Sequence, residues 1–272
     1  MINQRHMKYL IPVLFTVAMS ACSTSNSTGE NETTEVTPKK MRPIALDSGK
    51  FFELKGRKML YGGPDSTQHF DITDYILKDE QFHYGIGREV FPALLQPSFT
   101  SIEVADSLWN DDDRFLVAEK GNEAKAYSIK DLTRHEVVND EIDGTPIMAA
   151  YCILADLGAI YERDYGGQEL TFALSGYTYF DSAVWNGLDG FILWDRETES
   201  LWWPLIDQAV SGALQGTRLL EMDKAYWADV TWKDVKSKYP SAKVLVSNQD
   251  FERPATWDKM VDAAYIVEHF GK

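Results

Sequence analysis

Alternation of apolar and polar residues at a period of two dominates the chain from residue 51 to residue 205. Successive side chains of a strand point to opposite faces, so this pattern indicates half-buried strands. The alternating runs come in pairs, and a short turn-forming segment separates the members of each pair. The pattern predicts a first hairpin over 51–65 and four more from the pairs 115–120 with 124–129, 135–142 with 145–154, 157–163 with 168–176, and 190–196 with 200–205.

Helical spacing is confined to three segments. Ser98 to Leu108 is a short candidate, and Thr231 to Tyr239 opens with Thr231 and Asp234 in a pattern close to a capping box. Pro254 to Phe270 carries apolar residues at helical spacing. We therefore expect a β-dominated α+β fold, in which antiparallel hairpins curl into a barrel or sandwich, with a few short helices and a C-terminal helix.

The first 21 residues are typical of an export signal. Arg5 and Lys8 precede an apolar stretch that is too short to be a comfortable membrane span. The following Met19-Ser20-Ala21-Cys22 resembles the lipobox of bacterial lipoproteins, in which the cysteine receives a diacylglyceryl group. We expect lipidation at Cys22; the alternative is a secreted protein that leaves Cys22 in its signal.

Residues 22–42 are predicted to be a lipidated, disordered tether, because polar residues fill residues 23–40 and Val36 is the one large apolar side chain there. A single β-rich domain is expected over 43–272. The lipid anchor makes the membrane a partner and places the protein in a bacterial cell envelope. Ser23 after the lipidated cysteine favours the outer membrane, with the domain facing the periplasm or the cell exterior.

Charge and motifs exclude several functions. The formal net charge of −15 argues against nucleic acid, which requires a basic face. Gly85 to Val90 lacks the third glycine of a dinucleotide-binding loop, and Ser175-Gly176 lacks the flanking glycines of a nucleophile elbow. No complete catalytic set can be assigned, so an enzyme is a less favoured interpretation than a binding protein.

His135 and Cys152 lie at equal distances from the predicted Asp143-Gly144 turn, eight positions on either side. If the strand register is regular, their side chains are cross-strand neighbours. An imidazole beside a thiol can form a metal site or a nucleophile with its base. The alternative is a buried cysteine that packs as a small hydrophobe beside a hydrogen-bonded histidine. The residues alone leave both interpretations open.

An ordered series of short motifs resembles the bacterial family known as domain of unknown function 3179, from about residue 84 to 248. The motifs are Phe91-Pro92-Ala93-Leu94, Ala124-Lys125-Ala126-Tyr127, His135 to Asp140, Tyr151-Cys152, Ser175-Gly176, Trp194-Asp195-Arg196 and Gly216 to Leu219. The resemblance implies no established activity. Members commonly carry Cys-Pro-Leu-Cys after the tyrosine, and often a methionine before the aromatic-Asp-Arg motif. With the histidine, these residues form a soft ligand set that we infer would suit copper(I) or a related thiophilic ion.

The chain departs from that ligand set at three positions. Ile153 replaces the proline, Ala155 replaces the second cysteine, and Leu193 replaces the methionine. A site with His135 and Cys152 alone would bind a metal far more weakly unless Asp156 or a third residue completes it. We therefore expect a non-catalytic binding or interaction domain with a degenerate metal site. The alternative is a copper- or zinc-binding or redox lipoprotein that uses His135 and Cys152.

A run of aromatic residues between 177 and 203 suggests a second kind of ligand site. Aromatic faces among carboxylates suit a glycan or a protein groove, whereas alternating aromatics in a core are the alternative. Trp202 and Trp203 are adjacent, so one of them is expected to be exposed or covered by a loop. The run comprises Tyr177, Tyr179, Phe180, Trp185, Trp194, Trp202 and Trp203.

Overall fold

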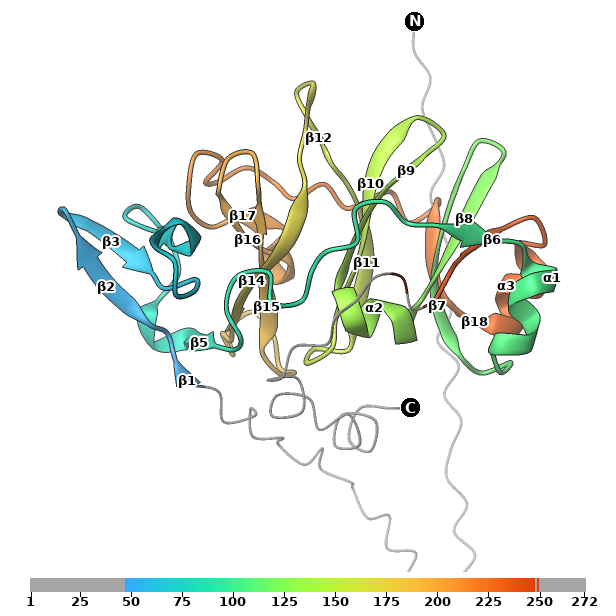
Figure 1. Ribbon diagram of the computed structural model, residues 1–272, viewed down its shortest axis with the longest axis horizontal. Helices are drawn as coiled ribbons and strands as arrows, with labels where there is room; N and C mark the ends of the chain where they lie inside the picture. The colour runs from blue at the N-terminus through green and yellow to red at the C-terminus, as the bar shows by residue number, and fades with distance from the viewer. Residues whose placement is uncertain (1–46, 248, 250–272) are drawn as a thin grey trace, which may run out of the picture. The chain divides into compact units, whose positions relative to one another are not determined.

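The computed structural model describes residues 47–247 and Gln249 (Figure 1). Strands dominate this part of the chain, as the alternating pattern predicts. The predicted export signal, Cys22, the tether and the predicted helix at 254–270 lie outside the described residues. Within the described residues, no helix is long and apolar enough to cross a membrane.

The largest sheet has six strands, and all of its pairs are antiparallel. The 190–196 and 200–205 hairpin forms its β15–β16 pair as predicted, with Leu193 opposite Trp202. A register shift between Leu174 and Tyr177 interrupts the pairing of β14 with β15. In spatial order the strands are β1 (Asp47–Ser48), β5 (Phe82–Tyr84), β14 (Phe172–Tyr179), β15 (Gly190–Asp195), β16 (Leu201–Trp203) and β17 (Gln208–Ala209).

Two further sheets are built around predicted hairpins. One is the three-stranded sheet β11 (Leu157–Glu162), β10 (Thr145–Cys152) and β9 (Val137–Ile142). The other has five strands, and its β8–β19 pair is parallel whereas its β19–β6 pair is antiparallel. Its order is β18 (Trp227–Thr231), β7 (Arg114–Lys120), β8 (Glu123–Ser128), β19 (Lys243–Leu245) and β6 (Phe99–Thr100).

The remaining strands form small sheets. The predicted first hairpin is present as β2 (Phe51–Leu54) and β3 (Arg57–Leu60), which β4 (Phe70–Asp71) extends. A two-stranded ribbon contains β12 (Asp164–Tyr165) and β13 (Gln168–Glu169). Each sheet among the described residues ends in edge strands, so the barrel alternative is not observed.

The predicted hairpin of 157–163 with 168–176 is wrong beyond its turn. Pairing there is limited to the β12–β13 ribbon around Gly166-Gly167 and one further hydrogen bond, from the Leu170 amide to the Arg163 carbonyl oxygen. The flanking strands separate: β11 pairs with β10, whereas β14 pairs with β5 and β15. Alternation identified both strands, but it carries no information about which partner each one takes.

Helices are short. The cap at Thr231 is confirmed, because its side-chain oxygen accepts a hydrogen bond from the Asp234 amide at 3.3 Å. The predicted helix at 98–108 is instead divided into β6, α1 and η3. In Figure 1, α1 and α3 lie together beside the five-stranded sheet; α3 contacts β7 and β18, and α1 contacts β19. The helices are α1 (Ile102–Ala105), α2 (Ile129–His135) and α3 (Trp232–Lys238), with 3-10 turns η1 (Ser66–Gln68), η2 (Asp79–Gln81), η3 (Asp106–Leu108) and η4 (Pro204–Ile206).

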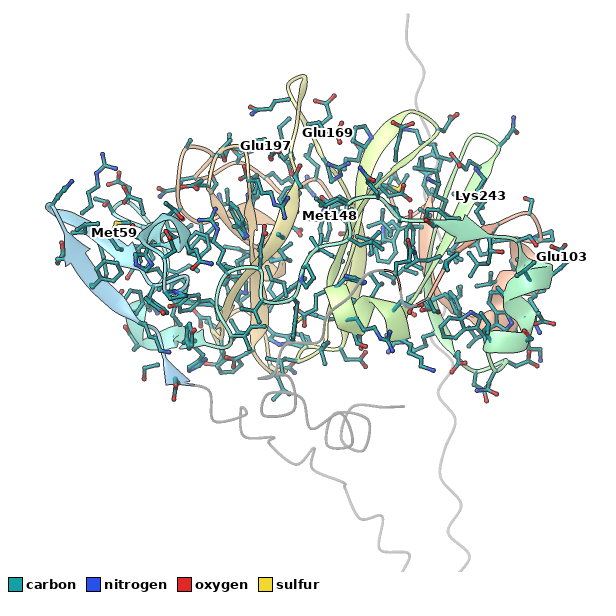
Figure 2. All side chains as sticks on the ribbon, viewed as in Figure 1. Met59, Glu103, Met148, Glu169, Glu197 and Lys243 are labelled. Carbon is teal, nitrogen blue, oxygen red and sulfur yellow. The ribbon has the colours of Figure 1, made fainter. Side chains whose placement is uncertain are left out.

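The cores lie between and beside the sheets. Met148, on β10, is fully buried, whereas Glu103, Glu197 and Lys243 lie at the surface (Figure 2). Trp202 and Trp203 are both buried, contrary to the expectation that one would be exposed. The reason is that β16 is an interior strand with both faces covered: Trp202 packs against Phe172, and Trp203 packs against Tyr179.

Most of the predicted aromatic run belongs to this core. Tyr177, Tyr179 and Trp194, like the two tryptophans on β16, are buried. Phe180 and Trp185 remain partly exposed. Five of the seven residues therefore fill the core, which was the alternative to a binding surface.

Candidate functional site

Cys152 ends β10 at the point where the three-stranded sheet meets the six-stranded sheet. Its sulfur accepts a hydrogen bond from the Phe191 amide at 3.4 Å and lies 3.9 Å from the Asp189 carbonyl oxygen, which the thiol can donate to. Phe191 lies at the start of β15, and Asp189 immediately precedes that strand. The lone thiol of the domain is therefore buried at a junction between two sheets.

Burial controls the chemistry of this thiol. Burial, and secondarily the neighbouring Glu136 carboxyl, raise the pKa of Cys152 to about 12, although amide hydrogen bonds from Ala155, Phe191 and Leu154 act in the opposite direction. The thiol is consequently protonated at neutral pH. A protonated, buried thiol is a poor nucleophile, because the thiolate is the reactive form.

Glu136 is a titratable side chain beside the thiol that the sequence did not single out. It follows α2 in the left-handed conformation, with φ of 54°, and its carbonyl accepts a hydrogen bond from the Tyr151 amide at 2.9 Å. Burial raises the pKa of its carboxyl to about 8, despite a hydrogen bond from the Ile153 amide. A neutral carboxylic acid therefore stands beside the neutral thiol at pH 7.

His135 is the last residue of α2 rather than a strand residue, so its predicted placement on a strand is wrong. The helix forms because Ser128 caps it by accepting a hydrogen bond from the Asp131 amide at 3.0 Å. Strand β9 begins only at Val137, which pairs with Ala150. The His135 ring contacts the Pro92 carbonyl oxygen through Nδ1 at 2.8 Å, and burial lowers its pKa. The metal role predicted for His135 and Cys152 stays a prediction.

Two cavities meet at Cys152 and Phe191, which line both. The first is an apolar pocket of about 50 Å³ that also exposes Glu136. The second has a volume of about 210 Å³ and is lined by small residues of β10 and β11, with Asp207 and Glu221. Ala155, which stands where relatives are expected to carry a second cysteine, lines this second cavity.

Leu193, which replaces the expected methionine, lines neither of these two cavities. Leu193 lies within β15 and is fully buried, and it pairs with Leu174 and Trp202. Among residues 47–247 and Gln249, no three His, Cys, Asp or Glu side chains cluster in a way that could hold a metal ion.

A second polar group lies near the thiol. His83 on β5 contacts the Asp189 carboxylate through Nδ1, and this hydrogen bond raises the pKa of His83. The Thr178 hydroxyl donates to the same carboxylate oxygen at 2.8 Å. The other oxygen, Asp189 Oδ1, is buried and has no hydrogen-bond partner within the described chain. Sequence gave no signal for this group, because its members come from three separate segments.

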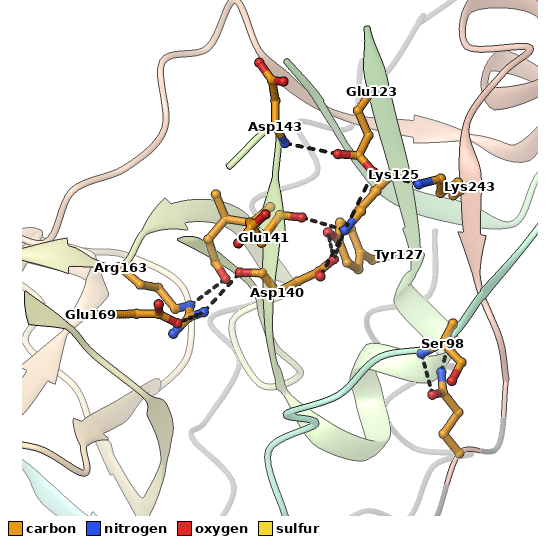
Figure 3. Close-up of polar contacts among 12 residues, drawn as sticks. Ser98, Glu123, Lys125, Tyr127, Asp140, Glu141, Asp143, Arg163, Glu169 and Lys243 are labelled. Carbon is orange, nitrogen blue, oxygen red and sulfur yellow. Dashed lines mark hydrogen bonds and ion pairs between the residues drawn. The ribbon is translucent and has the colours of Figure 1, made fainter. Parts of the chain in front are cut away.

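Several residues of the ordered motifs hold the sheets together. Asp140 on β9 accepts hydrogen bonds from Lys125 Nζ at 3.0 Å and from the Tyr127 hydroxyl at 2.7 Å, both on β8 (Figure 3). The buried Arg163 donates to the carbonyl oxygens of Asp140 and Ile147, at 3.0 and 2.7 Å. These hydrogen bonds satisfy polar groups that are removed from water, so the side chains have a structural role.

The Trp194-Asp195-Arg196 motif also has a structural role. The buried Asp195 carboxylate accepts hydrogen bonds from Trp202 Nε1 at 2.9 Å and from the Thr198 amide at 2.6 Å. Arg196 forms two hydrogen bonds with Glu89, each 2.8 Å long. The motif thereby fixes the turn between β15 and β16 and ties it to the segment around residue 89.

Comparison with known families agrees with the motif series. The matching family is described as "Protein of unknown function (DUF3179)", and the match covers residues 88–262. The resemblance inferred from the motifs is confirmed. Searches among curated proteins and among solved structures found no match.

Proposed function

The chain belongs to the DUF3179 family of unknown function, and from this membership and the cavities at Cys152 we propose that it is a non-catalytic ligand-binding domain. The proposed ligand site is the cavity of about 210 Å³ between β10, β11 and η4. That cavity is the observation that carries the proposal.

The composition of the cavity supports binding over chemistry. Its walls include small residues, among them Ala150, Gly158 and Gly190, which leave space between the sheets instead of filling it. Concave, mostly apolar pockets with a few polar groups are the usual form of small-ligand sites. The thiol at the back is protonated, with a pKa of about 12, so it contributes shape and polarizability and no nucleophile.

The second part of the proposal is location. We infer that the domain is exported and held at the bacterial outer membrane by lipid on Cys22, through the tether at 22–42. The support is the sequence pattern of the first 40 residues. In cells fed radiolabelled palmitate, the full chain should take up label and Cys22→Ser should not; equal labelling of both chains would overturn this part.

The binding proposal is tested by filling the cavity. Ala159, a partly exposed residue of β11, lines it, so Ala159→Phe should occupy its volume without overpacking a closed core. Benzyl alcohol is a suitable neutral probe, and isothermal titration calorimetry with the full chain in detergent measures its binding. The wild type should bind it, and Ala159→Phe should weaken binding by about tenfold or more.

Ala183→Phe is the matched control, because Ala183 is exposed in a loop outside the cavity. It should leave probe binding unchanged, and circular dichroism checks that both variants fold. If Ala159→Phe folds and binds benzyl alcohol as the wild type does, this cavity is not the site.

A thiophilic metal site is the second candidate function. The observation that favours it is the set of three amide donors at the Cys152 sulfur, from Leu154, Ala155 and Phe191, since hydrogen bonds of this kind stabilise a thiolate ligand. His135 would be the second ligand. Elemental analysis should then find copper or zinc in stoichiometric amount in the full chain, and Cys152→Ser and His135→Ala should each remove it. A metal-free wild type would exclude this candidate.

A further inference from the structure

We propose that the cavity beside Cys152 selects organic cations, that is, a protonated amine or quaternary ammonium group on a small apolar body. This inference rests on the proposed binding function and specifies the ligand class. Two carboxylates in the wall of the cavity, the hydroxyl of a largely buried tyrosine, and two aromatic rings together carry it.

The carboxylates are those of Asp207 and Glu221. Asp207 follows η4 in the left-handed conformation, with φ of 50°, and places a half-buried side chain at the cavity. Its pKa is raised first by burial and then by the charge of Glu221. The negative charge of Glu221 makes ionisation of Asp207 more costly, and a cation bound beside the two carboxylates would relieve this repulsion.

Tyr161 provides an independent observation. Its residue is only 6% exposed, it lies on β11, and its ring lines the cavity. No hydrogen bond to its hydroxyl is formed among residues 47–247 and Gln249, and the residue lines the cavity, so this oxygen is available to a bound ligand. Tyr161 forms an isolated antiparallel β-bridge with Glu221, and both residues line the same cavity as Asp207. Burial raises the Tyr161 pKa, and the charges of Asp207 and Glu221 act in the same direction. A ligand ammonium could donate to this oxygen.

The apolar walls suit the rest of such a ligand. Phe191 and Tyr161 contribute aromatic surface, and Leu205 and Pro204 contribute aliphatic surface. A cation over an aromatic ring is attracted by the electron-rich ring face, and more strongly when water is excluded. Aromatic rings with carboxylates therefore favour a cationic head group over a neutral or anionic one.

Positively charged side chains of the protein compete only in part with a ligand cation for the carboxylates of Asp207 and Glu221. Lys224 forms an ion pair with Glu221, but the lysine side chain is largely exposed and its Nζ also lies 3.6 Å from the centre of the Trp227 ring. Arg218, which is exposed, lowers the pKa of Asp207 without an ion pair to it within the described chain. Asp207 is thus the carboxylate that remains available to a ligand.

Three probes of similar size test the inference: benzylamine, benzyl alcohol and benzoate, which carry positive, zero and negative charge at pH 7. Calorimetry with the full chain in detergent should give benzylamine an affinity about tenfold or more above that of benzyl alcohol, and benzoate the weakest binding. Raising the salt concentration should weaken benzylamine alone, because Asp207 and Glu221 are partly exposed.

The variants separate charge from shape. Asp207→Asn should reduce the preference for benzylamine to about threefold or less and leave benzyl alcohol binding unchanged. Tyr161→Phe should also weaken benzylamine more than benzyl alcohol. Glu53→Gln, which removes an exposed carboxylate on β2, is the charge-matched control and should change neither affinity.

The outcomes distinguish this inference from the function on which it rests. Equal wild-type affinity for benzylamine and benzyl alcohol would overturn cation selection and leave the binding domain intact. Failure of all three probes to bind would count against both. Retention of the full preference in Asp207→Asn would exclude the assigned site.

Discussion

The side-chain amide of Asn139 forms two hydrogen bonds with the backbone of Phe172: Asn139 Nδ2 donates to the Phe172 carbonyl oxygen at 2.8 Å, and the Phe172 amide donates to Asn139 Oδ1 at 2.9 Å. Asn139 lies on β9 and Phe172 begins β14, so one side chain imitates a strand partner and links the three-stranded sheet to the six-stranded sheet. Both residues are buried.

Replacement of Asn139 by alanine should lower the free energy of unfolding by about 2–4 kcal/mol, because the Phe172 amide and carbonyl would remain buried without partners. Urea denaturation followed by tryptophan fluorescence measures this change. Asn186→Ala, at an exposed loop position, should shift stability by less than about 0.5 kcal/mol. Equal effects of the two substitutions would show that the Asn139 link contributes nothing specific.

Gly176 is predicted to be intolerant of any side chain. It has a φ of 80°, and a Cβ there would collide with the backbone of Gly87, while its carbonyl accepts amide hydrogen bonds from Gly85 and Ile86 at 2.9 and 3.2 Å. Gly176→Ala should cost more than about 3 kcal/mol of stability. Gly166→Ala is the matched control: φ is 70° but no atom lies within 4 Å of its Cβ, so only the backbone penalty of about 1 kcal/mol applies. Thermal denaturation of both variants should separate collision from backbone strain.

Glu136 should make stability fall as pH rises. Its pKa is about 8 in the folded protein against an ordinary 4.5, so between these values the folded state holds a proton that the unfolded state has lost. The stabilising effect of protonation is complete below pH 4.5 and lost as pH passes about 8. The slope should approach about 1.4 kcal/mol per pH unit inside that window.

Glu136→Gln isolates this contribution, since it keeps the shape and removes the titration. The difference in unfolding free energy between wild type and Glu136→Gln, measured at pH 5, 6, 7 and 8, should change in one direction across the series. His83, whose pKa is raised by its hydrogen bond to Asp189, acts in the same direction but cancels in the comparison. A difference that does not vary with pH would contradict the neutral form of Glu136.

The Cys152 thiol should be nearly inert in the folded protein. With a pKa of about 12 and almost no exposure, it should react with Ellman's reagent at pH 8 at least about 10³-fold more slowly than an unfolded-state thiol. Unfolding the protein with guanidinium chloride should raise the reaction rate to that of an unfolded-state thiol. Cys152→Ser should give no signal from this site. A rapid reaction of the native domain would indicate that the cavities open to solvent.

Hairpins of neighbouring strands were predictable because their partners are adjacent in sequence. The β7–β8, β9–β10 and β15–β16 pairs are confirmed for this reason. The pairs β8–β19 and β5–β14 join distant segments, and nothing in a local pattern specifies them. Helix α2 was missed because it is only seven residues long and depends on the Ser128 cap rather than on an extended apolar face.

The sequence could predict the site only in the part that the β9–β10 hairpin forms. The register through the Asp143-Gly144 turn correctly puts the segment before Val137 beside the end of β10, because the Glu136 carbonyl accepts a hydrogen bond from the Tyr151 amide. It could not reveal that a helix ends there. Tyr161, Asp207 and Glu221 come from separate segments and converge only through tertiary packing.

The five-stranded sheet also constrains when the chain can fold. Strand β6, near residue 99, pairs only with β19 among the described strands, and β19 ends at Leu245. During synthesis, β6 therefore has no partner until nearly the whole described chain has emerged, and the exposed edge of β8 waits equally long. The five-stranded sheet can therefore be completed only when synthesis of the described chain is nearly finished.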